Sequence, residues 1–165
     1  MQLVIENVSK SFGDKHVLND LSISLGQGII YGLLGRNGAG KTTLFSLIAR
    51  EENIDSGSIY LENNGKKESL EMQDIFFMLA EPDLPGFLTG REFVKFIIEA
   101  NTDRIDDLYD IDYYFNQVGF EEDDKDRLIQ GYSTGMRNKL QMIMFLILKP
   151  KVILMDEPLN SLDVV

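Results

Sequence analysis

Nine consecutive residues, Gly35 to Thr43, have the types and spacing needed to bind the phosphate groups of a nucleotide. They match the phosphate-loop pattern, in which a glycine is followed, after four further residues, by Gly-Lys and then Thr or Ser. Glycines let backbone N–H groups approach phosphate oxygens closely. Lys41 supplies a cation for the β- and γ-phosphates, and the Thr42 hydroxyl is placed to ligate Mg²⁺. The predicted nucleotide-binding residues of this loop are Gly35, Asn37, Gly38, Ala39, Gly40, Lys41, Thr42 and Thr43.

The flanking sequence supports this interpretation. A chance match to the pattern is expected in about one in 200 chains of this length and average composition. The apolar run Gly28 to Leu34 before the loop predicts a buried parallel strand. Thr42 to Arg50 predicts an amphipathic helix whose N-terminus points at the phosphates. The alternative interpretation is an ordinary glycine turn between a strand and a helix.

Two adjacent carboxylates follow another apolar strand, Val152 to Met155. In a phosphate-loop protein, an aspartate at the end of such a strand holds Mg²⁺, usually through water, which predicts that role for Asp156. The neighbouring Glu157 can accept a proton from an attacking water. Apolar strands ending in aspartate are common, so this motif indicates a metal-binding role only because the chain also contains the phosphate loop. Glu157 and Lys41 are the predicted catalytic residues.

The composition limits the classes of protein to consider. A chain of 165 residues is long enough for one domain with a core. The net charge of −11 disfavours nucleic acid as a partner. The absence of cysteine excludes disulfides, cysteine metal sites and thiol catalysis. No apolar run reaches the length of a membrane span, and the N-terminus lacks the features of a signal peptide.

The negative charge is concentrated between Asp103 and Arg127, where ten Asp and Glu face three Lys and Arg. Such a segment is typical of a solvated helical surface, and a docking face for a basic partner is the alternative.

Periodicity predicts a parallel α/β core that is interrupted by helices. Strands are expected at Leu3–Val8, Leu18–Leu25, Ser56–Leu61, Asp74–Leu79 and Val152–Met155. Helices are expected at Arg91–Ala100, along an apolar stripe from Ile105 through Leu108 and Ile111 to Val118, and from Ser133 to Leu148.

A third motif, Tyr132-Ser133-Thr134-Gly135-Met136, lies upstream of the acidic strand. Together, the three motifs resemble the ATP-binding subunit of an ABC (ATP-binding cassette) transporter. The third resembles the signature loop of that family, with Ser133 and Gly135 at its serine and second glycine and Thr134 in place of the first glycine. Residues 160–163 resemble the D-loop. Phe12-Gly13 matches the aromatic loop that stacks on adenine, with Phe for the more usual Tyr.

This resemblance implies an α/β fold: a P-loop NTPase with an ABC-type core sheet, an N-terminal antiparallel β part and an inserted helical subdomain. Residues 1–165 would form one nucleotide-binding domain, incomplete at its C-terminus. Residues 1–85 and 150–165 would form the RecA-like core with the β subdomain, and residues 86–149 the helical signature subdomain. The family's switch histidine would lie beyond the last residue, because His16, the single histidine, is near the N-terminus and is expected at the surface.

The resemblance also implies cofactors and partners. The cofactors would be ATP and Mg²⁺, and two such subunits would sandwich two ATP molecules, with Ser133 and Gly135 of one subunit capping the γ-phosphate held by the other. A membrane-spanning permease subunit would dock near residues 82–96, placing the protein in the cytoplasm, peripherally on the inner face of the cell membrane. Leu84 to Glu92 resembles the exporter ATPases that have separate membrane subunits.

One departure affects the metal site. The family's Q-loop glutamine falls at Ala80, which can neither ligate Mg²⁺ nor position water. Glu81 is a candidate substitute, and the alternative is a loop carboxylate without a ligand role. The predicted metal ligands are therefore Thr42, Asp156 through water, and Glu81.

The sequence leaves two other functions open. One is a soluble ABC ATPase that remodels ribosomes or chromosomes. The other is a module that binds ATP without turnover in this form, because Ala80 and the missing histidine leave its catalytic set incomplete.

Overall fold

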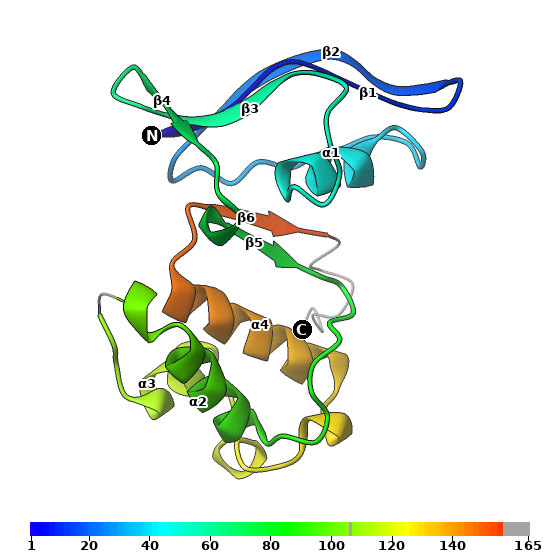
Figure 1. Cartoon of the computed structure of the whole chain (residues 1–165). Coiled ribbons are helices and arrows are strands. Elements are labelled where there is room, and N and C mark those ends of the chain that lie inside the picture. Colours follow the sequence, from blue (N-terminus) through cyan, green and yellow to red (C-terminus); the bar gives the residue numbers. More distant parts are fainter. Residues whose placement is uncertain (106, 157–165) are drawn as a thin grey trace. The chain divides into compact units, whose positions relative to one another are not determined.

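The computed structural model of the protein describes residues 1–105 and 107–156, which form two compact units. The first unit comprises Met1–Ile75 and the second begins at Phe76. Each unit is described by itself (Figure 1).

The first unit is built on an antiparallel sheet with the strand order β2-β1-β3-β4. Its elements are β1 (Gln2–Phe12), β2 (Lys15–Gly26), α1 (Lys41–Ile48), β3 (Ser56–Asn63) and β4 (Lys66–Ser69). A two-residue turn joins β1 to β2, and Gly13 occupies it with φ of 57°, a conformation that favours glycine. The predicted strands at Leu3–Val8, Leu18–Leu25 and Ser56–Leu61 are confirmed. β4 was not predicted, because its four residues are polar and exposed.

The segment Gly28 to Leu34 differs from its prediction. It is not a strand, and it is exposed rather than buried: Ile30 is 100% exposed and Leu34 is 94% exposed. A strand exists through ladder hydrogen bonds to its neighbours, and the four-stranded sheet of this unit does not include the segment. A buried parallel strand needs partner strands beside it and helices on both faces, and this unit supplies neither to the segment.

The second unit combines a short sheet with helices. Its strands are β5 (Ile75–Met78) and β6 (Val152–Met155), which pair and run in the same direction (Figure 1). Between them along the chain lie α2 (Gly90–Ala100), α3 (Ile111–Gln117) and α4 (Thr134–Leu148). Short 3₁₀ turns are found in this unit at Thr102–Arg104, Glu122–Asp124 and Ile129–Gly131, and another at Met72–Asp74 near the end of the first unit. This is the predicted crossover of a helical segment between two parallel strands.

The helices of the second unit share one apolar core. Its buried members are Phe93, Val94, Ile97, Tyr114, Phe115, Phe120, Ile129, Tyr132, Leu140, Ile143 and Ile147. Most members of the apolar stripes on the helices therefore lie in this core, whereas Phe96 and Leu108 are exposed. Within the described residues, no helix is both long and apolar enough to cross a membrane.

The helix boundaries follow their capping residues. Thr89 caps α2, where its hydroxyl accepts a hydrogen bond from Glu92 N–H while the Glu92 carboxylate accepts one from Thr89 N–H. The helix predicted from Ile105 to Val118 is shorter, because Asp110 caps α3 by accepting from Asp112 N–H at 2.9 Å. Leu108, which the apolar stripe assigned to this helix, precedes the cap and is exposed. Apolar spacing alone could not locate that cap.

Ion pairs organise part of the acidic segment. The Arg91 guanidinium contacts Asp112 at 2.9 Å, Asp126 at 3.1 Å and Glu122 at 3.7 Å. Lys125 is only 1% exposed at its side chain and contacts Glu122 at 2.5 Å and Asp112 at 3.1 Å. The hydrogen bond to Glu122 is the main cause that raises the pKa of Lys125. These carboxylates connect α2 and α3 to the turn before α4, so they are not merely a solvated surface.

Candidate functional site

The phosphate loop has the backbone conformation that its glycines allow. Gly38 and Gly40 have φ of 79° and 92°, in the left-handed region that side chains disfavour. A Cβ atom at Gly40 would lie 3.0 Å from Leu18 Cδ2 and 3.2 Å from the Val17 carbonyl oxygen. Glycine is therefore needed at position 40 both for its φ and for the close approach of β2.

The loop leads directly into the N-terminus of α1. Gly40 caps this helix without a side-chain hydrogen bond, and the first turn contains no acidic residue. The first N–H groups of the helix can therefore face an anion, which the helix dipole also favours. Thr42 lies in this turn and is exposed. The structure thus brings the predicted residues Gly35 to Thr43 into one arrangement suited to phosphate.

The Lys41 side chain folds back over the loop. Its Nζ donates hydrogen bonds to the carbonyl oxygens of Gly35 at 2.8 Å and Arg36 at 3.1 Å. The ammonium group is thereby held at the loop through which phosphate would bind. Exchanging these neutral acceptors for anionic phosphate oxygens would give stronger hydrogen bonds, because both partners would then be charged.

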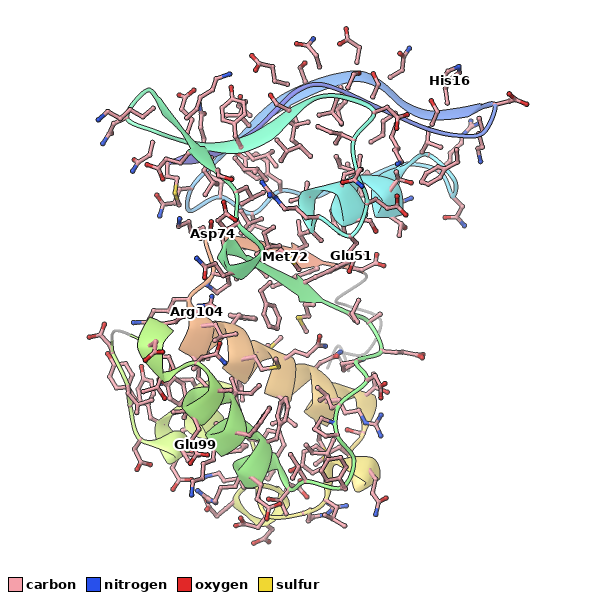
Figure 2. All side chains as sticks on the ribbon, in the orientation of Figure 1. His16, Glu51, Met72, Asp74, Glu99 and Arg104 are labelled. Atoms are coloured by element: carbon pink, nitrogen blue, oxygen red, sulfur yellow. The ribbon has the colours of Figure 1, made fainter. Side chains whose placement is uncertain are left out.

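Phe12 lies at the end of the β1–β2 hairpin, on the same side of the first unit as the phosphate loop. It pairs with Lys15, two residues from Val17, whose atoms approach Gly40. The Phe12 ring is 47% exposed, and Lys10 Nζ lies 4.9 Å from its centroid. The exposed part of this ring is available for the predicted stacking on a base. His16 is exposed on the same hairpin, with its Nδ1 2.9 Å from Ser11 Oγ (Figure 2).

Because phenylalanine has no hydrogen-bond donor or acceptor, a base held on Phe12 would be recognised through stacking. Base–aromatic stacking is worth about 1–3 kcal/mol. We expect Phe12→Ala to weaken ATP and GTP binding to a similar extent, with Phe12→Tyr close to wild type. Competition binding of the two nucleotides checks this, and a preference for ATP near a thousandfold would mean that a polar group reads the base edge.

In the second unit, the ends of β5 and β6 lie together. Asp156 N–H donates to the Met78 carbonyl at 3.2 Å, which places the predicted metal-binding aspartate beside the segment from Leu79 to Glu81. Within that segment Ala80 is half-buried and Glu81 is exposed. The two carboxylates proposed for Mg²⁺ thus follow neighbouring parallel strands, at the edge where ligands bind in open α/β sheets.

The predicted signature residues form the start of α4. Ser133 is exposed and caps the helix, because its Oγ accepts from Met136 N–H at 3.2 Å. Gly135 lies in the first turn. The preceding Tyr132 is buried, its hydroxyl donates to the Asp124 carbonyl at 2.5 Å, and burial raises the pKa of that hydroxyl. The signature loop is therefore held in place at the buried Tyr132, while Ser133, the next residue, is exposed to solvent.

The lack of a side chain at Gly90 leaves room for the Tyr132 hydroxyl. A Cβ atom there would lie 2.4 Å from the Tyr132 hydroxyl and 3.1 Å from the Lys125 carbonyl. We expect Gly90→Ala to lower the free energy of unfolding by about 2 kcal/mol through overpacking. Urea denaturation measures this, and adding Tyr132→Phe should recover part of the loss. Gly131→Ala is the matched control, because its Cβ would meet only Arg127 Nη2 at 3.9 Å; equal losses at both positions would contradict the steric explanation.

The predicted site residues are divided between the two units. Thr42 belongs to the first unit, while Glu81, Asp156, Ser133 and Gly135 belong to the second. Glu157 and the D-loop at 160–163 lie outside the described residues. Within residues 1–105 and 107–156, no three His, Cys, Asp or Glu side chains form a metal-binding group.

Sequence reasoning missed one residue of this region, Gln141. Its side-chain amide is bonded to the backbone of Leu79, at the end of β5. The available signal was a single polar residue that interrupts the apolar part of α4, and it did not show which backbone the residue would reach.

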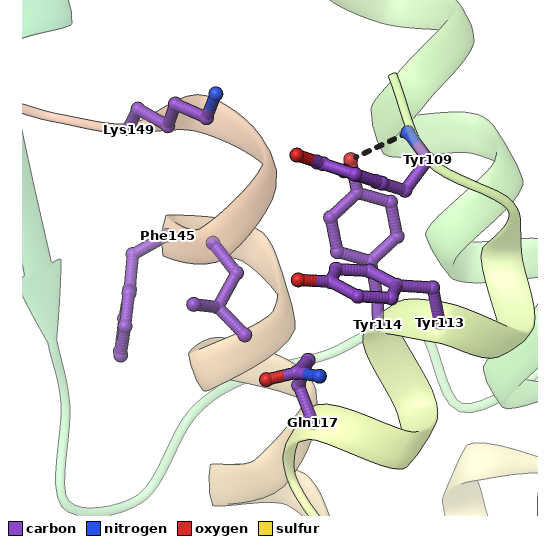
Figure 3. Close-up of a pocket in the computed structure, with 7 residues that line it drawn as sticks. Tyr109, Tyr113, Tyr114, Gln117, Phe145 and Lys149 are labelled. Atoms are coloured by element: carbon purple, nitrogen blue, oxygen red, sulfur yellow. Dashed lines mark hydrogen bonds between the residues drawn. The ribbon is translucent and has the colours of Figure 1, made fainter. Parts of the chain in front are cut away.

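A separate pocket of about 300 Å³ lies between α3 and α4 (Figure 3). Its lining consists of Tyr109, Tyr113, Tyr114, Gln117, Phe145, Leu146 and Lys149. The rings of Tyr109 and Tyr113 stack with centroids 4.4 Å apart, and the Tyr114 hydroxyl accepts from Tyr109 N–H at 3.3 Å. None of the predicted nucleotide-binding residues lines this pocket.

Comparison with known proteins gives a consistent result. The family model described as ABC transporter matches residues 18–160. The Fe(3+) ions import ATP-binding protein FbpC of Mannheimia succiniciproducens is 33% identical over 171 residues, which cover 98% of this chain and 46% of that protein. The lantibiotic transport ATP-binding protein SrtF of Streptococcus pyogenes is 32% identical over 162 residues, which cover 98% of this chain and 68% of that protein.

Two solved structures share the fold. One is the ATP binding subunit of an ABC transporter, with a TM-score of 0.78 and 22% identity, covering 99% of this chain and 69% of that one. The other is a dimeric post-hydrolysis state of the ATP-binding cassette MJ0796 bound to ADP and Pi, with a TM-score of 0.75 and 20% identity, covering 98% of this chain and 76% of that one. The predicted α/β fold is confirmed by these likenesses. The chain spans about half the length of several curated relatives, 46–52% for three of them.

Proposed function

Because the chain belongs to the ABC transporter family, we propose that it is the ATP-binding part of a membrane transporter and hydrolyses ATP to drive transport. The observation that carries this proposal is the loop from Gly35 to Thr43. It combines two left-handed glycines, a lysine held over the loop and an uncapped helix N-terminus. Such an arrangement holds phosphates through backbone N–H groups and one cation.

The chemistry is attack of water on the γ-phosphate. Catalysis of this reaction depends on positioning and on neutralising the charge of the transferred group. Lys41 and the N–H groups of α1 would stabilise that charge. Glu157 would accept the proton of the attacking water.

The residues present fit Mg²⁺, which takes hard oxygen ligands. The exposed Thr42 hydroxyl would be one ligand, and Asp156 would hold the ion through water. Glu81 is exposed at the edge that Asp156 shares, which supports it as a further oxygen donor in place of the amide missing at Ala80. Bound metal would supply charge neutralisation at the phosphates.

We propose that two copies of the subunit close on ATP. Residues 1–85 and 150–165 would act as the core of one nucleotide-binding domain and residues 86–149 as its helical subdomain. Ser133 is exposed and caps α4, and Gly135 lies in the first turn of that helix. Together they would offer a hydroxyl and helix N–H groups to a phosphate held by the other copy. The structural relative MJ0796 is a dimer with ADP and Pi bound, which agrees with this proposal.

The partner in the membrane would be a permease subunit that docks near residues 82–96, on the inner face of the cell membrane. Relatives are named for Fe(3+) import and for lantibiotic transport, so the family includes more than one kind of cargo. We propose export for this protein, on the resemblance of Leu84 to Glu92 to exporter ATPases. Co-expression with a candidate permease subunit, followed by uptake measurements in inverted vesicles, tests the direction.

Steady-state phosphate release by the full-length protein tests the activity. We expect ATP turnover that requires Mg²⁺ and stops when EDTA removes it. Tight ATP binding without phosphate release would favour the module that only binds ATP. Stimulation by ribosomes or DNA, rather than by the permease, would favour the soluble remodelling ATPase.

A further inference from the structure

Gln141 is a polar residue inside the apolar part of α4. It is only 4% exposed, although its neighbours Leu140, Met142 and Ile143 are apolar and two of them are fully buried. Burying an amide is unfavourable unless each of its polar atoms is hydrogen-bonded. The partners of this side chain therefore determine what it does.

The amide makes three hydrogen bonds, two of them to a single residue. Leu79 N–H donates to Gln141 Oε1 at 3.0 Å, and Gln141 Nε2 donates to the Leu79 carbonyl at 2.8 Å. The second hydrogen of Nε2 is directed to Asn138 Oδ1 at 3.1 Å, one turn earlier on α4. Because a peptide N–H can only donate, the amide oxygen must face it, and the orientation of the side chain is fixed.

The two hydrogen bonds between Gln141 and Leu79 take the place of the backbone hydrogen bonds that a neighbouring strand would make. Met78, the last residue of β5, is still bonded to the β6 side through Asp156 N–H. At the next residue, Leu79, the Gln141 amide satisfies both backbone groups as a neighbouring strand would. Leu79 is followed directly by Ala80 and Glu81. Gln141 therefore holds the base of the loop that carries the candidate metal ligand Glu81.

Ser133 caps the N-terminus of the same helix. Gln141 follows Ser133 by eight residues, which is about 12 Å along an α-helix. No flexible joint separates them, because α4 is continuous from Thr134 to Leu148. A displacement of the signature loop along this helix would thus be transmitted to Leu79 through the two hydrogen bonds of the Gln141 amide.

We propose that Gln141 is a positioning residue that makes the signature loop at Ser133 and the loop at Ala80 and Glu81 move as one body during ATP hydrolysis. The inference rests on the proposed function, because it takes both loops as parts of the nucleotide site. Gln141 itself touches neither nucleotide nor metal, since its amide hydrogens and oxygen are already engaged.

The test replaces the amide in the full-length protein. Gln141→Met keeps the length of the side chain and removes its hydrogen bonds, and Gln141→Asn keeps the amide but shortens its reach. Gln117→Met is the matched control, because Gln117 is exposed on α3. Bound ATP per chain is measured first, so that kcat refers to chains that bind nucleotide. If the Met variant does not bind ATP, the Asn variant carries the test.

A positioning role predicts a lower kcat without a matching change in KM. We expect both Gln141 variants to lower kcat about tenfold, as small misplacements of reacting groups do. KM for ATP should change by less than about twofold, because the phosphate loop is intact. The control should match wild type in both constants. A residue that served stability alone would leave kcat per nucleotide-competent chain unchanged, which would overturn the proposal.

The second readout does not depend on turnover. Spin labels on cysteines introduced at Thr134 and Glu81, both exposed, report the distance between the two loops. We expect one narrow distance distribution in wild type and in Gln117→Met, and a broad one in Gln141→Met. An equally narrow distribution in Gln141→Met would overturn the coupling. Absence of ATPase activity in the wild-type protein would instead count against the proposed function, whatever the labels report.

Discussion

Replacement of Lys41 by alanine is expected to weaken MgATP binding by about 10- to 150-fold. A hydrogen bond to a charged group contributes about 1.5–3 kcal/mol, and each 1.4 kcal/mol is a tenfold change in affinity. In the structure, Lys41 Nζ is already held at the loop by the Gly35 and Arg36 carbonyls. Binding therefore requires only that these acceptors be exchanged for phosphate oxygens. Calorimetric titration of both proteins with MgATP measures the loss.

The control for this variant is Lys66→Ala, which removes an exposed lysine from β4 of the same unit. It changes the net charge by the same amount but leaves the loop intact. Equal affinities in the Lys41 variant and wild type would exclude Lys41 from the site. Equal losses in both variants would show that net charge, rather than a direct contact, governs affinity.

The local elements could largely be predicted from the sequence, because each carries its own signal. β1 and β2 contain several Val, Ile and Leu residues and are separated by a Gly-Asp turn, and α4 begins at a serine cap and extends along an apolar face. Their boundaries depend on residues within a few positions. The same locality explains the error at α3, where the side chain of Asp110 caps the helix and makes it begin later than the apolar stripe does.

Features that depend on distant parts of the chain could not be predicted in the same way. The apolar run Gly28 to Leu34 has the composition of a buried strand, but its state is decided by partner strands, which its own sequence does not specify. Likewise, Gln141 finds its partner 62 positions away in the sequence, at Leu79. Periodicity identified the helix but not the backbone that its polar residue would bind.

The candidate site shows the same contrast between local features and features that depend on distant parts of the chain. The phosphate loop is continuous in sequence, so its residues could be named and its glycine conformations anticipated. The proposed Mg²⁺ ligands Thr42, Asp156 and Glu81 lie far apart along the chain, Thr42 in the first unit and the two carboxylates in the second. The order of the motifs along the chain suggested that combination.

Replacement of Glu157 by glutamine is expected to slow ATP hydrolysis by about 10²- to 10⁴-fold, the range attributed to general base catalysis. Glutamine preserves the shape of the side chain but cannot accept the proton of the attacking water. ATP affinity should stay near wild type, because the phosphate loop and Asp156 are unchanged. With hydrolysis blocked, ATP should also hold two copies together, which size-exclusion chromatography with and without MgATP would detect.

The control is Glu99→Gln, which removes an exposed carboxylate at the end of α2 whose contact is an ion pair with Lys95 (Figure 2). It should hydrolyse ATP at the wild-type rate and form no trapped dimer. Glu81→Gln separates the two acidic roles: loss of a metal ligand should raise the Mg²⁺ concentration needed for half-maximal rate, whereas loss of the base should not. Wild-type turnover by the Glu157 variant, combined with slow turnover by the Glu81 variant at saturating Mg²⁺, would transfer the role of general base to Glu81.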